Sequence, residues 1–131
     1  MLRQTVRSRA DLSRAGLLVG LAGASAVLLG AFGAHALRGV LDPAHRELWH
    51  TAVEYHAWHA LALVLAVGLG AGRAGRCAVI AFALGIVLFC GSLYALALGA
   101  PRWTGIVTPF GGVAFVVGWI ALGMTLRRSK D

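Results

Sequence analysis

The chain has 131 residues, of which 59% are hydrophobic and 13% are charged, and its mean hydropathy is +0.78. This composition excludes an ordinary water-soluble enzyme, and 18 glycines with only 3 prolines among long apolar blocks exclude a disordered or collagen-like chain. A formal net charge of +7 would suit nucleic acid. However, the basic residues lie at the ends of the apolar blocks, so we expect membrane anchoring and no nucleic-acid partner.

Four segments are long and apolar enough to cross a bilayer core, which takes about 20 residues. They cover residues 15–34, 51–71, 77–99 and 105–126, and all but the second are free of charge. We therefore predict an all-α membrane protein, a four-transmembrane-helix bundle over residues 15–126. Basic tails at 1–14 and 127–131 would flank it.

The first segment also has features of a secretory signal peptide, with a basic start and Ala34-His35-Ala36 after the apolar run. A signal core has roughly 7–15 apolar residues, and this run has about 20, so a tail followed by a membrane span is the simpler interpretation.

Small residues at fourfold spacing line several predicted helix faces. They form the sets Gly16, Gly20 and Ala24; Ala22, Ala26, Gly30 and Ala34; Gly91, Ala95 and Gly99; and Ala114 with Gly118. Such faces allow close helix packing in a membrane. The pattern predicts a tight bundle and leaves open whether some of these faces join copies in a homo-oligomer.

The second segment begins with Asp42 and Pro43, a typical N-cap and first-turn pair. The helix is predicted to run from Pro43 to about Gly72, either continuously or with a break near Trp49. At about 100° per residue, one face carries Glu47, His50, Glu54 and Trp58, and the opposite face carries His45, Trp49, His56 and His59.

The third segment contains both cysteines, Cys77 and Cys90. They are separated by roughly 20 Å along a helix, which excludes a disulfide between them. Aromatic residues near the outer boundary fit an interfacial belt: Trp49, Tyr55, Trp58 and Trp103. Trp119 lies deeper in the fourth segment and needs a packing partner of its own.

The distribution of Lys and Arg predicts the orientation. Nine lie on one side, namely Arg3, Arg7, Arg9, Arg14, Arg73, Arg76, Arg127, Arg128 and Lys130, and three lie on the other, namely Arg38, Arg46 and Arg102. Since positive residues concentrate in cytoplasmic connections, both termini are predicted to be cytoplasmic.

All five histidines fall between His35 and His59, in the outer half of the predicted bundle. Glu47 and His50 match half of a di-iron motif, but the other spans provide no acid, so we expect no metal site. A haem between His35 and His59 would require ligands at matching depths, and theirs differ, so no cofactor is expected. An ionisable group at membrane depth is still a candidate functional residue, which singles out Glu54 and His59. The alternative is that these side chains only stabilise the bundle.

Four motifs occur together in order: Leu29-Gly-Ala-Phe-Gly-Ala-His35, Thr51-Ala-Val-Glu-Tyr55 with His59-Ala-Leu-Ala-Leu63, Gly91-Ser-Leu-Tyr94, and Thr108-Pro-Phe-Gly-Gly-Val113. In these motifs the chain resembles the YgdD-like family of small membrane proteins, whose eukaryotic relative is called transmembrane protein 256. The resemblance implies a multi-pass protein of the bacterial inner membrane, in a family without an assigned activity.

The resemblance also selects residues. The positions that match the family pattern are His35, Glu54, Tyr55, His59, Ser92, Tyr94, Pro109, Gly111 and Gly112. The first six form our candidate polar pocket at the outer side of the bundle. Members of the family tend to lack a histidine at the position of His56, so we set His56 aside as a shared ligand.

Three functions follow from this sequence. The first is a non-enzymatic membrane protein with a structural or interaction role, and we favour it. The second is a pathway for protons or small solutes through Glu54 and His59, although the inner halves of the spans lack ionisable groups. The third is haem or metal binding.

Overall fold

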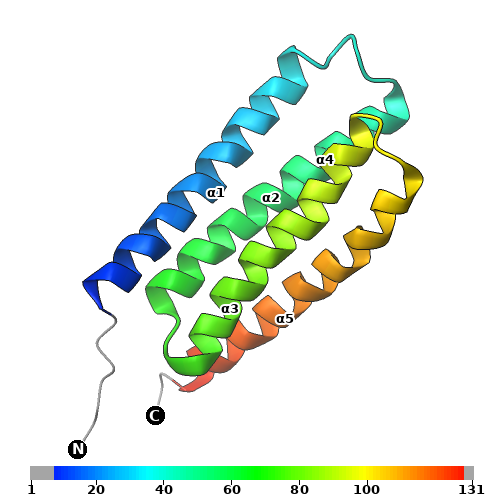
Figure 1. The fold of residues 1–131 in the computed structure, drawn as a ribbon. Coiled ribbons are helices and arrows are strands. Elements are labelled where there is room, and N and C mark those ends of the chain that lie inside the picture. The colour runs from blue at the N-terminus through cyan, green and yellow to red at the C-terminus, as the bar shows by residue number, and fades with distance from the viewer. Residues whose placement is uncertain (1–7, 129–131) are drawn as a thin grey trace, which may run out of the picture.

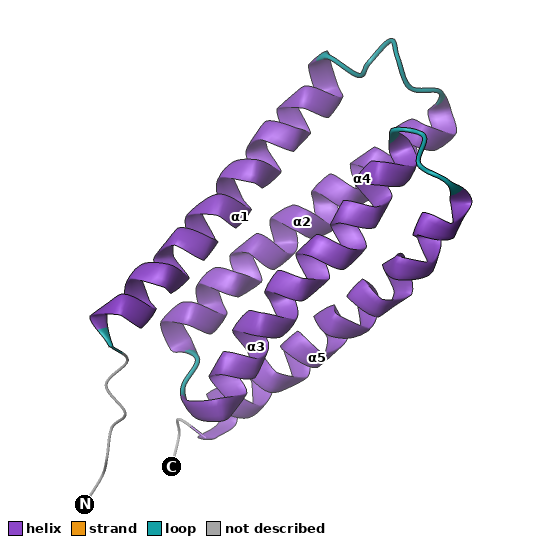
Figure 2. Cartoon of the chain, in the orientation of Figure 1, coloured by secondary structure: helices purple, strands orange, loops and turns teal. Residues whose placement is uncertain are grey.

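The computed structural model describes residues 8–128, in which the chain folds into a helical bundle without strands (Figures 1 and 2). The predicted all-α class and the four membrane-crossing helices are confirmed. Arg3, Arg7 and Lys130, which contribute to the predicted charge bias, lie outside the described residues, as do the outer parts of both predicted tails.

Helix α1 spans Arg9–His35 and begins earlier than the predicted span. Ser8 caps it, since its hydroxyl accepts a hydrogen bond from the main-chain N–H of Asp11 at 3.1 Å. Helix α2 spans Pro43–Leu69 and is capped by Asp42. The start predicted at Pro43 is therefore confirmed, and α2 is continuous through Trp49, which decides between the two alternatives.

The third crossing is built from three consecutive pieces that together form one helical span, Gly72–Ala97. They are α3 (Gly72–Gly85), the π-helical segment η1 (Ile86–Cys90) and α4 (Gly91–Ala97). The fourth crossing begins with a 3-10 turn, η2 (Arg102–Ile106), and continues as α5 (Val107–Arg128). The π-helical segment was not predicted, since its five apolar residues carry no proline or glycine.

The bundle has a three-helix core and one peripheral helix. Helices α2, α3–α4 and α5 pack around Leu63, Phe82 and Phe115, whereas α1 packs mainly along α2 at one edge (Figure 1). The described chain starts and ends at the same end of the bundle, which also contains the α2–α3 turn (Figure 1). We call this the basic end, because Arg9, Arg73, Arg76, Arg127 and Arg128 lie in the helix ends found there.

The α2–α3 turn is held by α5. Thr125 accepts a hydrogen bond from the main-chain N–H of Ala71 at 2.9 Å and donates one to the carbonyl of the same residue at 3.1 Å. Gly72 has a φ of +62°, in the left-handed region that favours glycine. These contacts fix the antiparallel pairing of the second and third crossings.

Candidate functional site

Helix α2 brings most of the polar side chains into the bundle. Its outward face carries exposed Glu47, His50, Glu54 and Trp58, and its inward face carries buried Trp49, His56 and His59. Burial thus agrees with the two faces predicted from the 100° period for these seven residues, whereas His45, also assigned to the inward face, is only partly buried and lies at the helix cap. Trp49 corrects the expected aromatic belt, because it is buried and its indole N–H donates to the carbonyl of Leu29 in α1 at 3.0 Å.

His59 lies at the contact between α2 and α5, with only 4% of its surface exposed. Its Nδ1 is 2.7 Å from the carbonyl oxygen of Tyr55, and its Nε2 is 3.2 Å from the indole nitrogen of Trp119. A carbonyl only accepts and an indole N–H only donates, so Nδ1 carries the proton and Nε2 is bare. His59 is therefore a neutral imidazole with both nitrogens bonded. Its ring also stacks on Phe115, with centroids 3.5 Å apart.

His56 lies one turn earlier and joins three helices. The hydroxyl of Ser25 in α1 donates to the carbonyl of Leu21 at 2.6 Å, so it accepts from Nε2 of His56 at 3.2 Å. Nδ1 of His56 then accepts from the hydroxyl of Tyr94 in α4 at 3.0 Å. These hydrogen bonds form a continuous series from Tyr94 through His56 and Ser25 to the carbonyl of Leu21. Both ring nitrogens of His56 therefore have a partner.

A third polar contact joins α4 and α5. The hydroxyl of Ser92 donates to the carbonyl of Phe89 at 2.9 Å and lies 2.6 Å from the hydroxyl of Thr108. Since the Ser92 proton is used on Phe89, Thr108 is the donor in this pair. Among the described residues, every buried side-chain nitrogen and oxygen has a hydrogen-bond partner.

The six residues of the candidate pocket are distributed over separate places. Tyr55 and His59 are in contact, Tyr94 bonds to His56, and Ser92 bonds to Thr108. His35 and Glu54 have exposed side chains, so they lie outside the buried contacts. The six therefore do not converge on one pocket.

Sequence reasoning missed the partners across the helices, namely His56, Ser25 and Trp119. His56 could have been identified from the sequence as a buried polar residue, since it shares the inward face of α2 with His59. Ser25 is the only hydroxyl residue within the predicted first span. Trp119 was expected to need a partner, and His59 is that partner.

The described residues 8–128 contain no group of three or more His, Cys, Asp or Glu side chains arranged to hold a metal ion. The histidine pair considered for haem does not suit one iron either. His35 is exposed at the end of α1, whereas both ring nitrogens of buried His59 are occupied.

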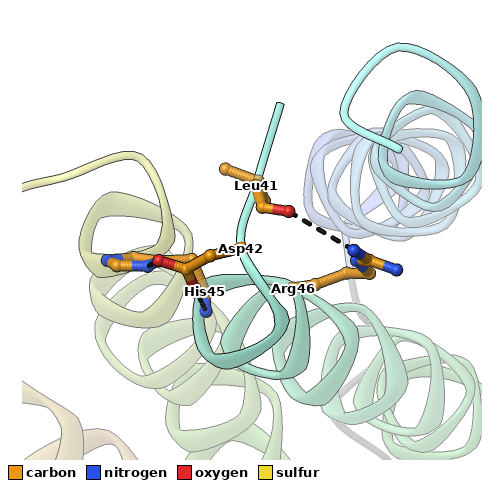
Figure 3. Close-up of polar contacts among 4 residues, drawn as sticks. All are labelled: Leu41, Asp42, His45 and Arg46. Carbon is orange, nitrogen blue, oxygen red and sulfur yellow. Dashed lines mark hydrogen bonds and ion pairs between the residues drawn. The ribbon is translucent and has the colours of Figure 1, made fainter. Parts of the chain in front are cut away.

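A separate polar contact stabilises the start of α2 at the opposite end of the bundle (Figure 3). The carboxylate of Asp42 accepts from the main-chain N–H of His45 at 2.9 Å and lies 2.8 Å from Nδ1 of the same residue. The main-chain hydrogen bond, reinforced by the ring, holds the pKa of Asp42 below its ordinary value of 3.8. Arg46 donates to the carbonyl of Leu41 at 3.4 Å. This cluster is an exposed helix cap.

Fold and site together define the class: a small multi-pass membrane protein whose buried polar side chains link its helices to one another. A family model described as "Protein of unknown function (DUF423)" matches residues 29–112. The chain belongs to this family.

Three relatives illustrate the match. The UPF0382 membrane protein YwdK of Bacillus subtilis is 45% identical over 102 residues, covering 74% of this chain and 82% of the relative. A UPF0382 membrane protein of Haemophilus influenzae is 41% identical over 117 residues, covering 87% and 94%. The UPF0382 inner membrane protein YgdD of Escherichia coli is 40% identical over 110 residues, covering 79% and 82%. No solved structure matches the chain.

Proposed function

We propose that this protein is a non-enzymatic, multi-pass protein of the bacterial inner membrane with a structural or interaction role, and that both of its termini are cytoplasmic. The observation that carries the proposal is that each buried side-chain nitrogen and oxygen of the described residues already has a hydrogen-bond partner inside the bundle. A catalytic or transport site needs polar groups that are free to engage a substrate.

His59 supports this interpretation over a proton pathway. A second proton on its ring would place an N–H at Nε2, facing the indole N–H of Trp119 at 3.2 Å. Two donors cannot bond to each other, so His59 would have to break this contact in order to carry a proton. The arrangement is that of a structural hydrogen bond between α2 and α5.

The proposed interaction surface is the outer face of α1, and its proposed occupant is α1 of a second copy. One small-residue face of α1, with Ala22, Ala26 and Gly30, packs on α2 within the chain. The other, with Gly16 and Gly20, meets open space. Only 11% of the most apolar stretch of α1 is buried, compared with 39% in α2. Small residues at this spacing are self-complementary between membrane helices.

Proton flux measured in sealed vesicles tests the main proposal. Vesicles containing the full chain, loaded with a pH-sensitive dye and subjected to a pH step, should equilibrate at the same rate as protein-free vesicles. The His59→Gln variant should behave identically. Faster equilibration with the wild type that is lost in His59→Gln would overturn the proposal in favour of a proton pathway.

Resonance energy transfer between donor- and acceptor-labelled copies in vesicles tests the α1 surface. Gly20→Leu should lower the transfer, because the bulky side chain separates the helix backbones. The control Gly123→Leu, at another glycine that meets open space, should leave it unchanged. Equal transfer in all three proteins, or no transfer above random proximity, would remove this surface.

A further inference from the structure

A groove between α3 and α5 opens at the basic end of the bundle, and none of its lining residues takes part in the contacts of His56, His59 or Ser92. It has a volume of about 480 Å³. Arg73 and Arg76 border its mouth, and its walls are apolar, formed by Ile80 and Leu84 of α3 and by Ala114 and Val117 of α5. We call it the arginine groove.

The groove has the length of one membrane leaflet. From Arg73 to Leu84, α3 rises roughly 16 Å at 1.5 Å per residue. Half of a hydrocarbon core of about 30 Å is about 15 Å. The charged mouth thus lies at headgroup level when the apolar walls lie in the acyl-chain region.

Arg73 and Arg76 lie side by side, and no acidic side chain of the described residues pairs with them. They are three residues apart, so their side chains project from the same face of α3. Both are exposed, and neither makes an ion pair with another residue between 8 and 128. They also lie in the first turns of α3, where the helix dipole disfavours cations and favours an anion.

We propose that the arginine groove binds one anionic phospholipid from the leaflet at the basic end. Its phosphate bonds to the guanidinium groups of Arg73 and Arg76, and one acyl chain lies along Ile80 and Leu84 toward Ala114. Arginine forms bidentate hydrogen bonds with phosphate, and basic pockets between membrane helices suit such headgroups. The charged mouth matches the headgroup, and the apolar walls match the acyl chain.

Mass spectrometry of the intact protein released from detergent micelles, which counts bound lipids, tests the proposal. The full chain is titrated with phosphatidylglycerol and, separately, with zwitterionic phosphatidylcholine. We expect one phosphatidylglycerol to bind more tightly than phosphatidylcholine. The double variant Arg73→Gln with Arg76→Gln should weaken phosphatidylglycerol binding at least about 10-fold, because both guanidinium groups lose their charge-assisted hydrogen bonds to the phosphate.

A matched control removes the same charge at the same end. Arg127→Gln with Arg128→Gln leaves the groove lining intact and should change the affinity by less than about 3-fold, since these residues do not border the groove. Equal losses in both double variants would show diffuse surface attraction and overturn the proposal, as would no loss in the Arg73 and Arg76 variant.

Two further measurements distinguish the contribution of the headgroup to binding from that of the acyl chain. Ala114→Leu narrows the groove and should weaken both lipids, whereas Ala24→Leu on the exposed face of α1 should weaken neither. Excess inorganic phosphate should leave the bound lipid in place. Complete displacement by phosphate, or full lipid binding by Ala114→Leu, would overturn the lipid assignment. Circular dichroism of each variant checks that it is folded.

Discussion

Single hydrogen bonds within the bundle should have measurable effects on stability, because few polar contacts join its helices. We expect Trp119→Phe, which keeps an aromatic ring but removes the donor to His59, to lower the free energy of unfolding by about 1 kcal/mol. Titration with a denaturing detergent measures this change. A double-mutant cycle with His59→Leu should give a coupling energy of similar size.

The control for this prediction is Trp103→Phe. Trp103 is exposed and lies outside the buried contacts, so its substitution should change the free energy of unfolding by less than about 0.5 kcal/mol. Equal stability of the two variants would contradict the role assigned to the indole of Trp119.

The cap of α2 predicts a pH dependence. Since folding lowers the pKa of Asp42 below 3.8, its carboxylate stabilises the fold above that pH. This contribution disappears as the pH falls through the lowered pKa. Asp42→Asn keeps a capping oxygen but does not titrate. Its melting temperature should therefore fall less than that of the wild type between pH 7 and pH 3. Identical acid losses in the two proteins would disprove the contribution of Asp42.

Residue roles were only partly predictable from the sequence. The faces of α2 followed from its period, because Glu47 and Glu54 have no partner that would allow them to be buried and therefore mark the exposed face. The partners of His56 and His59 did not follow. Ser25 and Trp119 lie 31 and 60 residues away, within the predicted spans 15–34 and 105–126, which contain no charged residue to set their rotation.

At the scale of the helices, close packing depends on where a glycine faces another backbone. A Cβ at Gly111 would overlap the main-chain nitrogen of Phe89, which cannot move aside, whereas a Cβ at Gly112 would lie 3.8 Å from the Phe89 ring. We predict that Gly111→Ala lowers the free energy of unfolding by about 1–3 kcal/mol. Gly112→Ala should be close to neutral. Detergent titration of both variants compares neighbouring glycines directly, and equal effects would refute this packing.

The helix boundaries show what the sequence predicts well. The Asp42-Pro43 pair predicted the start of α2 because capping is a local interaction. The π-helical segment over Ile86–Cys90 contacts α2 and α5, which lie far from it in the sequence, and its apolar residues alone gave no sign of it.

At the scale of the whole molecule, hydropathy predicted four crossings because backbone polar groups in lipid must be satisfied within helices. The peripheral position of α1 could not be predicted, since its composition resembles that of the core helices. The position of α1 depends on which of its two small-residue faces packs on α2. Ala26 is buried on α2, whereas Gly20 meets open space.

We propose that the chain crosses the membrane an even number of times, with both of its ends on the cytoplasmic side. The direct test uses a membrane-impermeant maleimide on intact spheroplasts, with single cysteines in a Cys77→Ser, Cys90→Ala background. Gly39→Cys and Ala100→Cys should react from outside, whereas Ser8→Cys and Ala71→Cys should react only after permeabilisation. Labelling of Ser8→Cys from outside, or of Gly39→Cys and Ala100→Cys from opposite sides, would contradict this topology.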